Sequence, residues 1–185
     1  MIRKDLPLTD LAALISEACR KRGADVVLSG GACVSIYTHN KYESFDLDFV
    51  LSVHADRPKA GSVLETLGFR LHGRHYRHAG TPYIVEFISP PLSVGGEPVR
   101  DIHEIRRGKA VLRLLSPTDC VKDRLAAYFH WNDRPSLEQA ILVCSAQDVD
   151  LREVQRWSLR EGMKDKYDAF RKRLAEALKE NKWGT

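Results

Sequence analysis

Two aspartates, placed two positions apart in an apolar run, are the residues of this chain best suited to chemistry. Asp46 and Asp48 lie in the segment 44–52, which is typical of a β-strand. Residues i and i+2 of a strand point to the same face, so the two carboxylates project side by side. Two like charges this close are costly unless a cation lies between them. The pair is therefore a candidate metal site, although an amphipathic strand with a solvent-facing polar side carries the same alternation.

A third carboxylate, Glu86, interrupts the apolar strand predicted over residues 83–88. If the two strands pair, the three carboxylates converge, and hard oxygen ligands of this kind suit Mg²⁺ or Mn²⁺. Two such ions can clamp the attacking and leaving oxygens of a phosphoryl-type transfer. A lone glutamate is also common on the solvent side of a half-exposed sheet, so its type alone leaves both interpretations open.

A glycine pair precedes the aspartates in the chain. Ser29, Gly30 and Gly31 follow a short apolar strand, residues 26–28, and precede a predicted helix over residues 32–38. A Gly-Gly turn at a helix N-terminus lets backbone amides approach a phosphate, although many such turns are only turns. The order of strand, Gly-Gly, helix and Asp-x-Asp strand makes the phosphate interpretation more specific.

The remaining periodicity predicts an α/β core over residues 1–115 and a helical region over residues 116–185, packed on that core. A first helix is expected up to Arg22, capped by Thr9 or Asp10. Further expected elements are a helix over 58–67, strands near 69–71, 75–77, 105 and 111–115, a loop over 92–98, and helices from 116, over 135–145, 151–161 and 166–179.

Composition limits the class of protein. The chain has 185 residues, 43% hydrophobic and 29% charged, with a formal net charge of +4, which permits an anionic partner without requiring one. It contains no apolar run of about 18 residues and no secretory signal at its N-terminus. Its four cysteines show no CxxC spacing and are expected to be reduced thiols. We expect a cytoplasmic protein without a membrane span.

The segments 28–31 and 44–49, together with Glu86, resemble the DNA polymerase β-like nucleotidyltransferase superfamily. Within it the chain looks most like the small prokaryotic AbiEii-type proteins. The resemblance implies an α+β nucleotidyltransferase fold, in which a short mixed sheet is flanked by helices and followed by a C-terminal helical region.

The resemblance also implies residue roles. The catalytic and metal-binding residues would be Asp46, Asp48 and Glu86. The two aspartates would hold Mg²⁺ (or Mn²⁺), and the glutamate would help to activate the attacking hydroxyl. The NTP-binding residues would be Ser29, Gly30, Gly31 and Lys122, although the lysine also reads as an ordinary solvated helix charge.

The activity implied is Mg²⁺-dependent transfer of an NMP from an NTP to a hydroxyl acceptor, RNA or protein. The resemblance also implies a toxin–antitoxin or defence setting for this activity, with an antitoxin-type protein partner. The chain departs from the AbiEii pattern in two places. Only Glu138 stands in for a later acidic motif, and Lys41 and Tyr42 occupy the place of an expected arginine. The alternative is therefore a catalytically inactive nucleotidyltransferase-fold protein that binds nucleotide, nucleic acid or a protein partner.

A Gly-flanked basic segment, residues 71–78, contains His72, His75 and His78. Its basic and aromatic residues could contact an anionic acceptor such as RNA. An exposed hairpin explains the same composition and is the interpretation favoured by the sequence. The spacing of the histidines is unlike that of a zinc motif.

Overall fold

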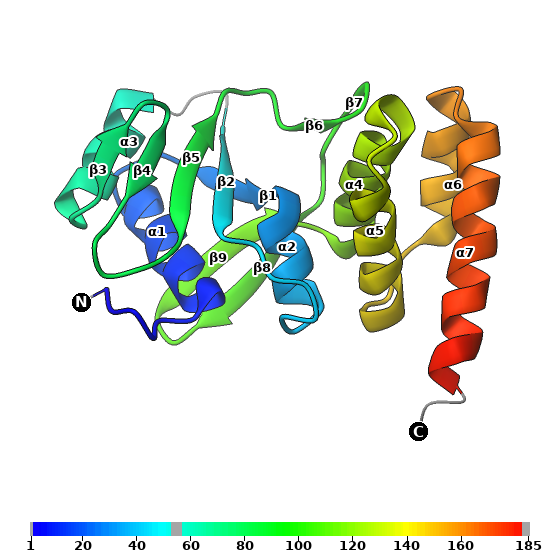
Figure 1. Ribbon diagram of the computed structural model, residues 1–185. Helices are drawn as coiled ribbons and strands as arrows, with labels where there is room; N and C mark the ends of the chain where they lie inside the picture. Colours follow the sequence, from blue (N-terminus) through cyan, green and yellow to red (C-terminus); the bar gives the residue numbers. More distant parts are fainter. Residues whose placement is uncertain (1, 53–56, 183–185) are drawn as a thin grey trace.

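The computed structural model describes residues 2–52 and 57–182 and centres on a seven-stranded mixed β-sheet (Figure 1). The strands lie in the order β3-β4-β5-β2-β1-β9-β8. Their bounds are β1 Val26–Ser29, β2 Asp46–Leu51, β3 Arg70–His72, β4 His75–Arg77, β5 Ile84–Ile88, β8 Ile102–Arg107 and β9 Ala110–Leu115. The expected α+β class, with a mixed sheet flanked by helices, is confirmed.

Helices flank the sheet and make up the C-terminal part of the chain (Figure 1). Their bounds are α1 Leu8–Lys21, α2 Gly30–Tyr37, α3 Arg57–Thr66, α4 Pro117–Trp131, α5 Arg134–Ala146, α6 Leu151–Arg160 and α7 Lys164–Lys182. Helix α1 packs against β1, β9 and α3, whereas α2 packs against β1 and β2 and contacts α4 and α5. The helix α2 thus lies between the sheet and the C-terminal helices.

The central strand β2 is antiparallel to β1 and parallel to β5. Its apolar residues Leu47 and Phe49 are fully buried, because one face of the strand belongs to the core. Asp46 is exposed and Asp48 half-buried on the other face. The predicted alternation is therefore present, and it leaves the two carboxylates on the face that the core does not occupy.

A proline-initiated turn begins the helical region. Ser116 is the N-cap of α4, and its Oγ accepts a hydrogen bond from the backbone N–H of Asp119 at 3.1 Å, as the Ser-Pro-Thr-Asp sequence predicts. Further along α4, the Phe129 ring stacks on Trp157 of α6 with centroids 5.6 Å apart. The Trp157 indole N–H donates to the backbone carbonyl of Val94 at 3.2 Å. This aromatic pair joins α4 and α6 to the segment that follows β5.

The start of the first helix differs from the expectation. Helix α1 begins at Leu8 with Pro7 as its N-cap, and no side chain caps it. Thr9 and Asp10 lie in the first turn, so the capping role expected for them is wrong. The carbonyl of Pro7 instead accepts the first helical hydrogen bonds, from Asp10 and Leu11 at 3.0 Å.

The segment expected as a plain loop over 92–98 contains two short paired strands, β6 Ser93–Val94 and β7 Glu97–Pro98. They are joined by Gly95 and Gly96, and Gly95 has a φ of +58°. A two-residue Gly-Gly connection favours a hairpin, because its left-handed backbone matches the twist of the strands. The sequence therefore carried this signal in its two adjacent glycines.

No helix within residues 2–52 and 57–182 combines the length and the apolar character needed to cross a bilayer. All four cysteines are free thiols. Three of them, Cys19, Cys33 and Cys120, are buried in the core.

Candidate active site

Three neighbouring strands place Ser29, Asp48 and Glu86 in one row across the sheet. Ser29 lies opposite Asp48 in the β1–β2 register, and Asp48 lies opposite Glu86 in the β2–β5 register. Residues directly opposite each other in adjacent strands project to the same face. Asp46, two residues before Asp48, shares that face. The pairing of the two carboxylate-bearing strands, on which the sequence argument depended, is therefore found.

The three carboxylates line a hollow of about 360 Å³. The rest of its lining consists of Arg74, His75 and Ile84. Nε of Arg74 lies 3.5 Å from one carboxylate oxygen of Glu86, and Nδ1 of His75 lies 3.2 Å from the other. Glu86 is thus held by two side chains of the β3–β4 hairpin, and no local pattern in the sequence indicates this contact.

Asp48 is the carboxylate of the site whose pKa is shifted. Burial, together with the neighbouring carboxylates of Asp46 and Glu86, raises the pKa of its carboxyl to about 6. The guanidinium of Arg124, on α4, opposes this shift. Because the shift is upward despite that arginine, the ionised site lacks positive charge close to Asp48.

The donor set suits a hard cation in its chemistry but only partly in its geometry. Mg²⁺ is commonly held by one or two carboxylates together with waters and substrate phosphates, and Asp46 and Asp48 offer such a pair. Across the described ranges 2–52 and 57–182, however, no three His, Cys, Asp or Glu side chains are grouped closely enough to hold a metal ion. Since Glu86 is engaged by the hairpin, the two aspartates fit a magnesium site and the complete triad does not.

The Gly-Gly turn lies directly against the central carboxylate. Gly30 has a φ of +68°, and a Cβ at this position would lie 2.7 Å from Oδ2 of Asp48. The Ser29 hydroxyl donates to the backbone carbonyl of Asp48 at 3.2 Å, and it makes no capping bond to α2. The first amides of α2 are therefore left without a side-chain acceptor, beside the carboxylate face.

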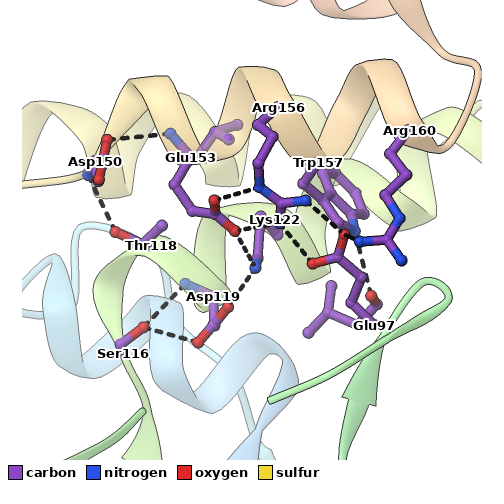
Figure 2. Close-up of polar contacts among 12 residues, drawn as sticks. Glu97, Ser116, Thr118, Asp119, Lys122, Asp150, Glu153, Arg156, Trp157 and Arg160 are labelled. Carbon is purple, nitrogen blue, oxygen red and sulfur yellow. Dashed lines mark hydrogen bonds and ion pairs between the residues drawn. The ribbon is translucent and has the colours of Figure 1, made fainter. Parts of the chain in front are cut away.

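Lys122 lies in a different part of the molecule. Its ammonium is buried and lies 2.7 Å from Asp119 Oδ1 and 3.3 Å from Glu153 Oε1 (Figure 2). It lines a second hollow of about 600 Å³ between α4, α6 and the β6–β7 hairpin. Lys122 is not among the residues that line the carboxylate hollow. The structure thus does not bring this lysine together with the other predicted site residues.

Arg124, two positions further along α4, lies close enough to Asp48 for its guanidinium to lower the pKa of that carboxyl. Residues two apart on a helix face in nearly opposite directions, so Arg124 and Lys122 cannot serve the same side of α4. Arg124 is paired with Asp123 at 2.5 Å and donates to Gln139 at 3.4 Å. Its charge acts on Asp48, as described above. The helical periodicity of α4 was the available signal, but only the docking of α4 on α2 shows which side faces the carboxylates.

Glu138, the expected stand-in for a later acidic motif, accepts hydrogen bonds from Arg173 of α7 at 3.2 Å. It therefore joins two helices of the C-terminal region and is not part of the lining of the carboxylate hollow.

The raised pKa of Asp48 predicts a specific pH dependence of stability. A carboxyl whose pKa rises from 3.8 to about 6 on folding stabilises the fold fully below pH 4 and loses that contribution as the pH rises through 6. Relative to Asp48→Asn, the wild-type free energy of unfolding is expected to fall by up to about 3 kcal/mol between pH 4 and pH 7. Urea unfolding at stepped pH measures this. The exposed Asp165→Asn variant should keep the wild-type profile, and coincident profiles for wild type and Asp48→Asn would contradict the assignment.

A comparison of Gly30→Ala with Gly108→Ala separates two effects, the strain of a left-handed backbone and the close approach of residue 30 to Asp48. Gly108, in the β8–β9 turn, has a similar φ of +61° but no atom within 4 Å of an added Cβ. Both alanine variants are expected to lose about 1 kcal/mol of stability, because each forces a left-handed backbone on a residue with a Cβ. Only Gly30→Ala should also displace the Asp48 carboxylate and change its pKa, measured by NMR titration. An unchanged pKa in Gly30→Ala would disprove the contact.

Lys122→Met tests whether this lysine is structural. Loss of the ammonium leaves Asp119 and Glu153 without their shared partner, and removing one member of a buried ion pair costs about 3 kcal/mol. Thermal or urea unfolding should show this loss, with NTP binding intact under conditions where the variant is folded. Lys109→Met, at an exposed turn, is the matched control and should change stability by less than about 0.5 kcal/mol. A stable Lys122→Met variant that no longer binds NTP would return the lysine to a nucleotide-binding role.

Comparison with known proteins adds information at the level of the fold. No protein-family model matches the chain, and no curated sequence matches it. Among solved structures, an antigenic nucleotidyltransferase-like protein from Paracoccidioides brasiliensis matches with a TM-score of 0.57 and 14% identity, over 77% of this chain and 78% of that one. The solution structure of the antibiotic-resistance factor ANT(2'')-Ia matches with a TM-score of 0.51 and 15% identity, over 96% and 97% of the two chains. At these identities the likeness concerns architecture, and the chain therefore has the nucleotidyltransferase fold.

Proposed function

We propose that this protein is a metal-dependent nucleotidyltransferase that moves an NMP from an NTP to the hydroxyl of an acceptor, with release of pyrophosphate. The observation that carries the proposal is the row Ser29, Asp48 and Glu86 across β1, β2 and β5. In this row three groups are neighbours: a glycine turn that could bind phosphates, an aspartate pair that could bind a cation, and a carboxylate that could accept a proton. The likeness of fold to nucleotidyltransferases supports the same class of reaction.

Asp46 and Asp48 would hold the metal ion, Mg²⁺ or Mn²⁺. The bound ion would neutralise charge on the phosphates and on the leaving group. The raised pKa of Asp48 supports this assignment, because a bound cation would offset the burial and the neighbouring negative charges that disfavour the ionised carboxylate. Asp46, exposed at the start of β2, would complete the pair from the same face.

The turn over residues 29–31 would receive the β- and γ-phosphates of the NTP. The amides of Gly30 and Gly31 begin α2, and the positive end of the helix dipole favours an anion there. In this proposal Lys122 has no contact with the nucleotide, because its ammonium is already shared by Asp119 and Glu153.

Glu86 would act on the acceptor. Its carboxylate lies on the far side of Asp48 from the glycine turn and is oriented by His75 and Arg74. There it would accept the proton of the attacking hydroxyl at one carboxylate oxygen. In-line attack then requires the acceptor on the Glu86 side and the pyrophosphate on the Ser29 side. The acceptor class is RNA or protein, and the AbiEii resemblance supports a toxin–antitoxin or defence setting with an antitoxin-type partner.

One observation favours the alternative, a nucleotidyltransferase-fold protein that binds without catalysis. Glu86 is engaged by Arg74 and His75, so the three carboxylates are not assembled as one metal site. If that engagement persists when nucleotide binds, Asp46 and Asp48 could still bind a metal–nucleotide complex without transferring it.

Label transfer tests the proposal. The chain is incubated with NTPs labelled at the α- or γ-phosphate, Mg²⁺ or Mn²⁺, and total RNA or cell lysate. Transfer of the α label alone is expected, because an NMP moves and pyrophosphate leaves. Asp46→Asn and Asp48→Asn should abolish transfer, and Glu86→Gln should slow it by about 10²- to 10⁴-fold while NTP binding persists.

Asp165→Asn, an exposed change on α7, is the matched control and should transfer label at the wild-type rate. Undiminished transfer by Asp48→Asn would remove the activity from this site. Absence of transfer, with metal-dependent NTP binding intact and lost in Asp48→Asn, would support the non-catalytic alternative.

A further inference from the structure

The β3–β4 hairpin is a concentrated source of positive charge. The segment 69–83 contains three arginines and three histidines and has no acidic residue. Both residues of the turn and most of the two strands are exposed. The hairpin forms one edge of the sheet, next to β5 (Figure 1). Its charge is therefore presented to solvent beside the candidate active site.

The register places this charge on the same sheet face as the carboxylates. His72 lies opposite His75, His75 lies opposite Glu86, and Glu86 lies opposite Asp48. Because opposed residues share a face, the row that begins at Ser29 continues through Asp48 and Glu86 onto the hairpin. Arg70 and Arg77, two residues from the histidines along their strands, project to this face as well.

Arg70 and Arg77 face each other directly across the hairpin. Like charges in opposed positions destabilise a strand pair unless an anion lies between them. Arg74 is paired with Glu86, but neither Arg70 nor Arg77 has an ion pair with any acidic residue of the described chain. A hollow of about 360 Å³ beside them is lined by Gly68, Arg70, His72, Arg77, His78 and Ala79. Two guanidinium groups and two imidazoles thus surround a space that holds no carboxylate.

We propose that this hollow is a phosphate-binding subsite for the acceptor, so that the acceptor is a phosphate-bearing molecule and not a polycation. Planar guanidinium groups bind phosphate oxygens in a bidentate manner, and Arg70 and Arg77 converge on one space. The inference rests on the proposed function, because Glu86 is there the group that meets the acceptor. Glu86 and His72 are two strands apart, about 10 Å, so one molecule can reach both.

The direction of approach follows from the row. The nucleotide is assigned to the Ser29 end, and the hairpin occupies the opposite end beyond Glu86. An acceptor held at Arg70 and Arg77 would therefore present its hydroxyl to Glu86 from the side away from the nucleotide. A polycationic acceptor would meet Arg70, Arg74 and Arg77 on this path and be repelled.

The test measures acceptor binding without NTP or metal, so its outcome is independent of whether transfer occurs. Fluorescence anisotropy follows a labelled, 5′-phosphorylated single-stranded oligoribonucleotide, with ribose 5-phosphate and inorganic phosphate as competitors. Arg70→Gln combined with Arg77→Gln is expected to weaken binding by about 10- to 100-fold, since each charged hydrogen bond to phosphate contributes up to about a factor of ten. The slope of log affinity against log salt should fall by about 1 to 2.

Arg106→Gln combined with Lys109→Gln, on the β8–β9 hairpin at the opposite edge of the sheet, is the matched control and should bind as the wild type does. The melting temperature of the Arg70/Arg77 double variant should not fall, because the change relieves like-charge repulsion, and this excludes misfolding as the cause of lost binding.

Binding of the oligonucleotide that depends on Arg70 and Arg77 supports a phosphate subsite that takes RNA. If ribose 5-phosphate binds and the oligonucleotide does not, and this binding depends on Arg70 and Arg77, the subsite is supported and is assigned to a small phosphorylated acceptor. Equal affinities of the wild type and the Arg70/Arg77 double variant, or equal losses in the Arg106/Lys109 control, would overturn the proposal.

Discussion

The half-buried carboxylate of Asp48 is the group on which the rest of the site depends. It lies on the central strand, where Ser29 flanks it from β1 and Glu86 from β5. The turn at Gly30 approaches it so closely that a side chain there would collide with its oxygen. Burial and two neighbouring carboxylates oppose its ionisation, and the guanidinium of Arg124 offsets this only in part.

The C-terminal helices hold the Gly-Gly turn in its position next to Asp48. The Tyr37 hydroxyl at the end of α2 donates to the carbonyl of Leu115 at 2.5 Å, and Gln147 donates to the carbonyl of Tyr37 at 2.8 Å. These bonds fix α2 between the sheet and the helix α5, so the Gly-Gly turn at its other end is held against β2. The buried ion pairs of Lys122 with Asp119 and Glu153 join α4 to α6 and stabilise the same packing (Figure 2).

Local signals were sufficient for most elements of the fold. Apolar periodicity and the Ser116-Pro117 pair placed helices and strands to within a few residues of their observed bounds. The misassignments arose where local signals compete. Pro7 displaced Thr9 and Asp10 as the cap of α1. The Gly95-Gly96 pair made a hairpin from the segment 92–98, which was expected to be a loop.

The sequence by itself determined that Asp46 and Asp48 share one face, because strand geometry alternates side chains with a period of two. It did not determine what surrounds them. The engagement of Glu86 by His75 and Arg74, and the separation of Lys122 from the carboxylates, depend on strand order and helix docking. These are set by burial of the whole core between residues distant in the chain. The tertiary structure alone therefore decided that the candidate site is an aspartate pair between a glycine turn and a basic hairpin.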